Sequence, residues 1–318
     1  PSAALWVWDV ATAQPIHKLA VNSTLGEILL TADDRLLIYG GFFNDGTVHV
    51  WDMETGQELA SFTDPPSKER GSIRGLALSA DERFLAVIFD REGASTVSVW
   101  ETSSWKAVRT FAPTPQSNSG ISMIFSRDGR SLFVSNSDTS ILEWDVSGRF
   151  GRKTEIPNKD RLNVLWRKLA ETPDKAYPAV WEMLDHPAES VPFLIEKVSP
   201  VKPVEEKRVR QLLAQLDSES FAEREKAGDQ LLALGEQIVP ILRQTLKERL
   251  TLEVRKRVEG VIESLNRGPT TEQLRSLRAL AVLEWSKRPE AVEHLRQLAG
   301  GAASALLTRA AKAAWQRR

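Results

Sequence analysis

The chain has 318 residues, of which 42% are hydrophobic and 27% are charged, and its formal net charge is −1. These values are typical of globular proteins, and the length allows two ordinary domains. The absence of cysteine excludes disulfides, thiolate metal sites and a cysteine nucleophile. It leaves the cellular compartment open, with the cytoplasm favoured. No apolar run reaches the roughly eighteen residues that a membrane-spanning helix needs.

The two halves of the chain carry opposite charge. Residues 1–157 contain 14 Lys and Arg against 20 Asp and Glu, a net charge of −6, and residues 158–318 contain 28 against 23, a net charge of +5. The sign changes where the period of the apolar residues changes from the two of strands to the 3.6 of helices. We therefore predict two domains, 1–157 built of strands and 158–318 built of helices. Their opposite charges would also allow the two halves to dock on one another.

Tryptophan followed by an acidic residue recurs through the first half. The four pairs are Trp8-Asp9, Trp51-Asp52, Trp100-Glu101 and Trp144-Asp145, and their spacings are 43, 49 and 44 residues. Residues 44–62 show the repeated hairpin: a tight turn at Asn-Asp-Gly, a strand that ends in tryptophan, a second turn and another short strand. Two further strands precede each of the last three tryptophans, at 25–31 and 36–39, at 73–79 and 84–89, and at 121–126 and 131–135.

This period, with four short strands in each repeat, resembles the WD-repeat (WD40) β-propeller family. The resemblance implies about three complete four-stranded blades and part of a fourth within residues 1–157, with the missing blades upstream of Pro1. The segment 147–156 makes a poor outer strand, and the resemblance implies that a strand from the other end of the domain completes the last blade.

The same resemblance implies a hydrogen-bond network around the strand tryptophan. In the family, a histidine before the first strand joins an Asp, a Ser or Thr and the tryptophan. The corresponding stretches here, 22–24, 69–71 and 118–120, contain no histidine. We therefore expect an incomplete network and blades that depend more on apolar packing.

The second half has the signals of antiparallel helix pairs. Asn158 or Asp160 is expected to cap the first helix, and capping boxes are expected at Ser220 to Glu223 and at Thr270 to Gln273. Similar sequences begin at Val191, Val239 and Val292, 48 and 53 residues apart. This pattern resembles PBS-lyase HEAT-like repeats, which implies an α-helical solenoid but transfers no lyase chemistry. The order of the two modules is similar to that in large bacterial WD-repeat proteins.

No combination of residues indicates catalysis. The histidines at 17, 49, 186 and 294 lie in different elements without a second ligand at metal spacing, so structural roles are expected. Acidic pairs at 33–34 and 81–82 fall in hairpin turns, where such residues are common for conformational reasons. We therefore assign no catalytic, cofactor-binding or metal-binding residue, no cofactor, and no particular partner-binding residue.

The leading hypothesis is a non-catalytic scaffold for protein partners, because both repeat types present broad surfaces. One alternative is the C-terminal sensory or regulatory region of a larger bacterial protein, with a catalytic or transcription-related domain upstream of residue 1. Another, less favoured, is nucleic-acid binding through basic clusters of the helical half at 207–208, 255–257 and 317–318. These clusters lie among glutamates, which favours their interpretation as solvated helix faces.

Overall fold

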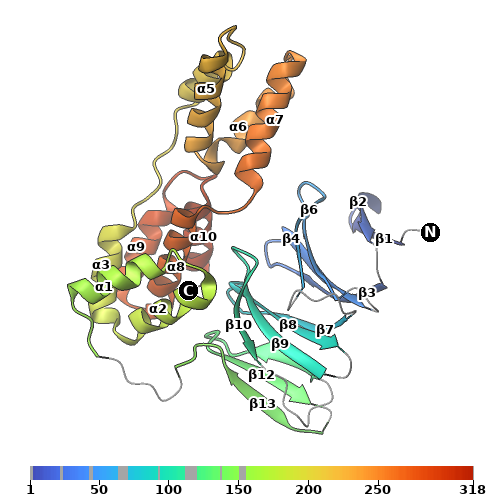
Figure 1. Cartoon of the computed structure of the whole chain (residues 1–318), viewed down its shortest axis with the longest axis vertical. Helices are drawn as coiled ribbons and strands as arrows, with labels where there is room; N and C mark the ends of the chain where they lie inside the picture. Colours follow the sequence, from blue (N-terminus) through green and yellow to red (C-terminus); the bar gives the residue numbers. More distant parts are fainter. Residues whose placement is uncertain are drawn as a thin grey trace. The chain divides into compact units, whose positions relative to one another are not determined.

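The computed structural model describes residues 3–21, 24–42, 46–63, 71–91, 94–111, 120–136, 138–149 and 155–317. In these residues, thirteen strands are followed by ten α-helices and one short 3-10 helix (Figure 1). Contacts divide the chain into two compact units, one of residues 1–152 with 172–178 and the other of residues 153–171 with 179–318. No helix of the described residues is long and apolar enough to cross a membrane.

The strands form four antiparallel sheets that follow one another in sequence. The first contains β1 (Ala3–Asp9) and β2 (Gln14–Val21). The second contains β3 (Thr24–Leu30), β4 (Leu36–Phe42), β5 (Val48–Asp52) and β6 (Gln57–Phe62). The third contains β7 (Ser72–Leu78), β8 (Phe84–Arg91), β9 (Ala94–Glu101) and β10 (Lys106–Phe111). The fourth contains β11 (Gly120–Phe125), β12 (Ser131–Asn136) and β13 (Ile141–Asp145).

The described residues therefore form fewer complete four-stranded sheets than the three that the sequence predicted. Two sheets have four strands, and the last has three because residues 146–149 and 155–156 form no strand after β13. Residues 150–154 lie outside the described part, as do Asn44 and Asp45 of the predicted hairpin turn. The weak outer strand that the sequence indicated at 147–156 is consistent with this incomplete last sheet.

The recurring tryptophans occupy the same place in three successive sheets. Trp51 pairs with Leu37, Trp100 with Leu85, and Trp144 with Leu132, each across the second and third strands of its sheet. A one-residue slip would turn each indole to the opposite sheet face, so the shared register shows that the sequence repeat is also a structural repeat.

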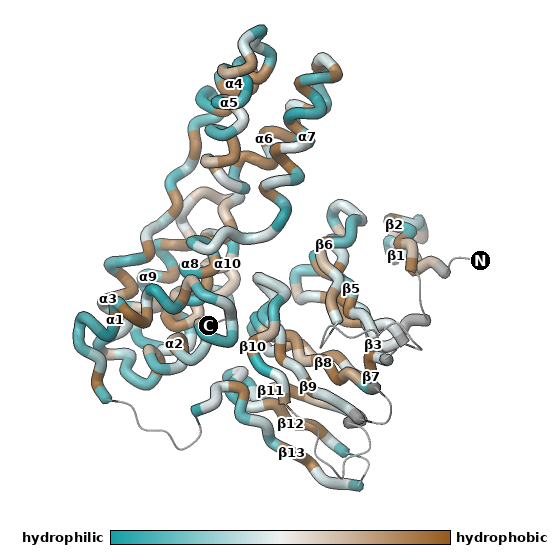
Figure 2. The backbone as a smooth tube through the Cα atoms, in the orientation of Figure 1, coloured by the Kyte–Doolittle hydropathy of each residue, from teal (hydrophilic) through white to brown (hydrophobic). Residues whose placement is uncertain are grey.

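Apolar packing joins the sheets through their faces. Residues 84–89 of β8 form an apolar run (Figure 2) and are all at most 2% exposed, because the third sheet is covered on both faces. One core fills the space between the second and third sheets and includes Ile38, Val50, Ile73 and Val87. Strand β7 packs against β3 and β4 on one side and against β11 on the other, so the first strands of successive sheets are neighbours.

The helical part of the chain has two of the predicted helix caps. Its helices are α1 (Lys159–Lys168), α2 (Pro173–Asp185), α3 (Pro187–Lys197), α4 (Glu206–Gln215), α5 (Phe221–Ala233), η1 (Glu236–Ile238), α6 (Val239–Thr245), α7 (Leu252–Asn266), α8 (Thr271–Ser286), α9 (Pro289–Ala299) and α10 (Leu306–Gln316). Asn158 caps α1 by accepting a hydrogen bond from the Arg161 amide at 2.9 Å. The capping box of Thr270 and Gln273 is present at the start of α8.

The other predicted capping box is wrong. Ser220 makes no side-chain cap on α5, and the Glu223 carboxylate accepts a hydrogen bond from the Ser218 hydroxyl at 2.5 Å. Residues Asp217–Ser220 thus form a local hydrogen-bonded turn that competes with the capping box for the Glu223 carboxylate.

The helices form two packed groups within the unit. Helices α4 to α7 share a core with Val209, Leu212, Leu231, Leu242 and Val258 at its centre. Helix α3 packs against α8 and α9, and α10 packs against both α8 and α9. In a linear solenoid each pair packs on its sequence neighbours. Helix α3 instead contacts α8 and α9, although helices α4 to α7 lie between them in the sequence. The repeat pattern did not predict this contact.

Candidate interaction surfaces

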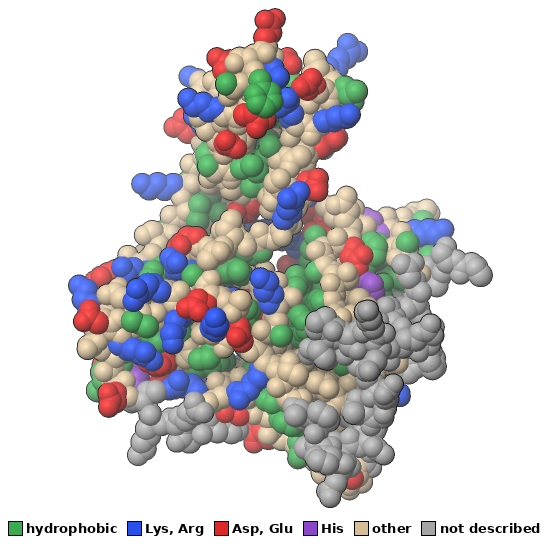
Figure 3. Space-filling model, viewed as in Figure 1, with side chains coloured by type: hydrophobic (Ala, Val, Ile, Leu, Met, Phe, Trp, Pro, Cys, Tyr) green, Lys and Arg blue, Asp and Glu red, His purple; other side chains and the backbone are tan. Residues whose placement is uncertain are grey.

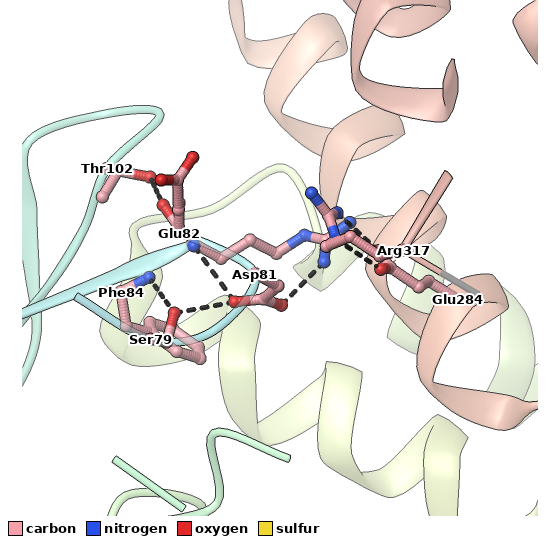
Figure 4. Close-up of polar contacts among 8 residues, drawn as sticks. Ser79, Asp81, Glu82, Phe84, Thr102, Glu284 and Arg317 are labelled. Carbon is pink, nitrogen blue, oxygen red and sulfur yellow. Dashed lines mark hydrogen bonds and ion pairs between the residues drawn. The ribbon is translucent and has the colours of Figure 1, made fainter. Parts of the chain in front are cut away.

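A hydrogen-bonded turn is repeated three times between the first and second strands of the sheets. The hydroxyls of Thr31, Ser79 and Ser126 each donate to the carboxylate two residues later, all at 2.7 Å. The same carboxylate oxygens, of Asp33, Asp81 and Asp128, each accept from the backbone amide two residues further on, at 3.1 Å. Figure 4 shows the Ser79 and Asp81 copy. The acidic turn residues therefore have the conformational role that the sequence indicated.

The Asp81 copy is the most enclosed of the three. Burial opposes ionisation of this carboxyl, but the charge of Arg83 and the hydrogen bonds from Ser79 and Arg83 outweigh it and lower the pKa of Asp81 from 3.8 to about 2. The guanidinium of Arg83 lies 2.7 Å from the carboxylate, and the side chains are only 16% and 14% exposed, respectively. Asp81 is thus an ionised structural group at neutral pH.

The aspartates after Trp8 and Trp51 also support turns. One oxygen of Asp52 accepts from the amides of Glu54 and Thr55 at 2.8 and 3.0 Å, and one oxygen of Asp9 accepts from the amides of Ala11 and Thr12 at 2.8 and 2.9 Å. This is an Asx-type turn, which side-chain carboxylates readily form. The repeated acidic residue therefore shapes the scaffold, and nothing in these contacts calls for chemistry.

No hydrogen-bond network around the strand tryptophans is seen among the described residues, and most of the stretches 22–24, 69–71 and 118–120 lie outside them. The indole nitrogens of Trp51, Trp100 and Trp144 are buried and have no hydrogen-bond partner among the described residues. Their rings are held by packing instead: Trp100 stacks on Phe62 with ring centroids 4.2 Å apart, and Trp144 contacts Phe111 at 4.7 Å.

One end of the row of sheets exposes an apolar surface on β1 and β2, which we call the β1–β2 face. Trp6 and Trp8 are 47% and 54% exposed, Ile16 is also exposed, and Lys18 lies with its Nζ 5.0 Å from the Trp6 ring centroid. The opposite face packs on the second sheet through Leu5 and Val21. The alternation along β1 therefore places tryptophans on the uncovered side.

The other end of the row has a matching uncovered surface, the β11–β13 face. Ile124 and Ile141 are 67% and 71% exposed. Ile124 is opposite Phe133 and Ile141 is opposite Ser135, so both isoleucines are on one face of the sheet. The terminal sheets thus each leave one apolar face in water, which is a usual mark of an interaction surface.

The helical unit presents mixed charge. On the face shown in Figure 3, acidic and basic side chains are interspersed over α4 to α7. Arg257 of one predicted basic cluster bonds Glu253 at 2.8 Å, and Arg317 of another bonds Glu284 at 2.9 Å, a pair also drawn in Figure 4. Arg208 donates to Gln230 at 2.6 Å, and Arg318 lies outside the described residues. Arg257 and Arg317 therefore already have carboxylate partners within the chain, which leaves less positive charge at these two positions for a phosphate.

The four histidines are not brought together. His17 contacts the Met53 carbonyl at 2.6 Å, His49 contacts Glu58 at 2.6 Å, and the buried His294 contacts the Val198 carbonyl at 2.8 Å. His186 is the N-cap residue of α3. Among the described residues no three side chains of metal-ligating type form a group. An uncovered apolar blade face is expected from an incomplete set of blades, but the residues of the two terminal faces were not assigned from sequence, although the alternating Trp-Val-Trp of β1 is a signal for one of them.

No family model matches the chain. The chain is similar to the small ribosomal subunit protein RACK1 of Drosophila melanogaster, with 26% identity over 149 residues. The similarity covers 44% of this chain and 43% of that protein, so the chain spans less than half the length of this relative. This distant similarity to a WD40 protein and the antiparallel four-stranded sheets both fit a WD-repeat propeller.

Proposed function

We propose that the chain is a non-catalytic scaffold for protein–protein interaction, built from part of a WD-repeat propeller (residues 1–157) and a helical repeat module (residues 158–318). The observation that carries this proposal is the identical register of Trp51, Trp100 and Trp144 in successive sheets. Repeats of this kind form rigid, extended surfaces on which proteins dock. The distant similarity to RACK1 supports the same role.

The proposed propeller requires further strands to cover its two terminal faces. About half of each side chain of Trp6 and Trp8, and more of Ile124 and Ile141, remains in water. Full burial of such a side chain is worth about 1.5 to 3 kcal/mol, so covering these four would contribute roughly 4 kcal/mol. We propose that further blades of the same polypeptide cover the β1–β2 face and the β11–β13 face, and that an added outer strand pairs with β13.

The helical module is proposed to consist of HEAT-like hairpins. The three similar sequences, which begin at Val191, Val239 and Val292, lie in the second helices of the pairs α2–α3, α5–α6 and α8–α9. Their mixed surface charge favours protein partners over nucleic acid, because nucleic-acid binding depends on uncompensated cationic groups.

Affinity capture from cells that produce the natural polypeptide tests the proposed role. The tagged protein is expected to retain specific proteins after nuclease treatment. A charge-reversal variant of an exposed basic pair, Arg255→Glu with Lys256→Glu, is expected to leave this capture unchanged. Retention of nucleic acid alone, lost in that variant, would instead support the nucleic-acid alternative.

A further inference from the structure

A small hollow lies inside the helical unit where the α5–α6 hairpin meets the start of α8 and the start of α10. Its volume is about 210 Å³. Its apolar walls are Val201, Leu234, Leu277, Ala305, Leu306 and Leu307. The four leucines and the valine are only partly buried, so their side chains are accessible from the hollow.

Hydrogen bonds hold the walls in place. Glu236 accepts from the Leu306 amide at 2.7 Å and also bonds the Gln273 side chain. Ser304 donates to the Gln237 carbonyl at 2.9 Å, and the Ala302 amide donates to the Val201 carbonyl at 2.8 Å. Each contact joins segments far apart in sequence. The hollow is therefore formed before anything binds, which reduces the entropic cost of binding.

The volume limits what can enter. Pockets for cofactors and drug-sized ligands are typically about 300 to 1,000 Å³. A cavity of about 150 Å³ lined by aliphatic side chains is enough to bind benzene. The hollow is between these sizes, so it fits one bulky apolar side chain rather than a whole cofactor.

The charged residues that line the hollow favour a positively charged ligand. Glu236 and Glu272 line the hollow, and no lysine or arginine does. One oxygen of Glu272 contacts Arg275 at 2.7 Å, but the Glu272 side chain is 65% exposed, and such surface pairs contribute at most about 1 kcal/mol. Glu272 can therefore exchange this contact for a cation on a ligand.

We propose that this hollow binds a leucine or phenylalanine side chain of a partner protein, in a segment that carries lysine or arginine on either side. The inference rests on the proposed interaction role and adds a site and a sequence preference to it. The apolar walls bind the central side chain, and the exposed Glu272 carboxylate selects a flanking cation.

Methyl NMR of the full chain, labelled at leucine and valine, tests the site with three short capped peptides. The sequences are Lys-Leu-Lys, Lys-Ser-Lys and Glu-Leu-Glu. At millimolar concentration, Lys-Leu-Lys is expected to shift the methyl signals of Leu277, Leu306 and Leu307. Removing the leucine side chain or reversing the flanking charges is expected to weaken binding about tenfold or more, in line with the burial of one such side chain.

Three variants make the test specific. Ser276→Phe places a ring in the hollow and is expected to abolish the shifts, while Glu272→Lys is expected to reverse the charge preference towards Glu-Leu-Glu. The matched control is Glu293→Lys, which changes a carboxylate on α9 that does not line the hollow. Circular dichroism checks folding, and Glu272→Lys decides the matter if Ser276→Phe does not fold.

The inference is overturned if Lys-Leu-Lys gives no shifts, if Lys-Ser-Lys binds equally well, or if Glu272→Lys keeps the original preference. None of these results would bear on the scaffold role, which the separate capture experiment tests. Loss of nuclease-resistant capture while the peptide still binds would remove the scaffold role and keep the site.

Discussion

Replacing Asp81 with alanine should destabilise the third sheet more than the same change at the equivalent turn of the second sheet. Asp81 accepts hydrogen bonds from Ser79, from the Arg83 amide and from the Arg83 guanidinium. Neutral hydrogen bonds contribute about 0.5 to 1.5 kcal/mol and those to charged groups about 1.5 to 3, so we expect a loss of about 3 kcal/mol. Asp33→Ala is the matched control, because Asp33 makes the first two contacts from an exposed position, and its expected cost is about 1 kcal/mol.

The pH dependence gives a second, independent measure at Asp81. Its pKa is lowered in the folded protein to about 2, so its ionised carboxylate stabilises the fold above the ordinary pKa of 3.8. This stabilisation, worth about 2 kcal/mol from the shift, should be lost as the pH falls from about 4 to about 2. The difference between the wild type and Asp81→Ala should therefore shrink over that range.

Native-state hydrogen exchange is the suitable assay, read on peptides that cover β7 and β8 for Asp81→Ala and on peptides that cover β3 and β4 for Asp33→Ala. A chain of two compact units need not have a single unfolding free energy, and exchange reports the stability of each region separately. Equal costs for Asp81→Ala and Asp33→Ala would refute the assigned role of the enclosed Arg83 contact. A difference that stays constant between pH 4 and pH 2 would refute the lowered pKa of Asp81.

Three further substitutions test other parts of the fold. Thr270→Ala should lower the free energy of unfolding by about 1 kcal/mol, because it removes the capping box of α8. Ser220→Ala should lower it by less than about 0.5 kcal/mol, because the Ser220 side chain does not cap α5. Urea denaturation compares the two variants. Trp100→Phe should lower the free energy of unfolding by about 1 to 2 kcal/mol and Trp100→Ala by about 3 to 5, because the ring contributes packing while its indole nitrogen has no partner among the described residues. Thermal unfolding measures both variants. A cost for Trp100→Phe as large as that for Trp100→Ala would show that the indole nitrogen makes a hydrogen bond. Arg278→Ala should cost about 3 kcal/mol because the buried guanidinium donates to the carbonyls of Leu169 and Glu171 at the end of α1, and faster hydrogen exchange in α1 would show it.

The sequence predicted the elements because their signals are local. The alternation around each tryptophan defines strands and their register, and Asn158 and Thr270 define helix starts by bonding to amides within three residues. The same local reasoning failed at Ser220, where the nearby Ser218 hydroxyl takes the Glu223 carboxylate. Two local hydrogen-bond patterns competed there, and composition alone does not decide between them.

The sequence could not predict features that depend on contacts between distant residues. The packing of α3 against α8 and α9 depends on which apolar faces meet, and the similar helix pairs have interchangeable patterns. The hollow near Glu236 is formed by four segments spread over more than a hundred residues. Trp6 and Trp8 are exposed because no neighbouring sheet of the described residues covers them, and the type of a residue does not show whether such a neighbour is present.

Sequential affinity capture tests the proposed scaffold role most directly. The natural polypeptide is captured first through its own tag, and the eluted material is captured again through a tag on one partner protein. The scaffold role predicts that a second, different protein is recovered together with the chain and the first partner after nuclease treatment. Recovery of each partner only in separate complexes, or of no protein at all, would contradict it.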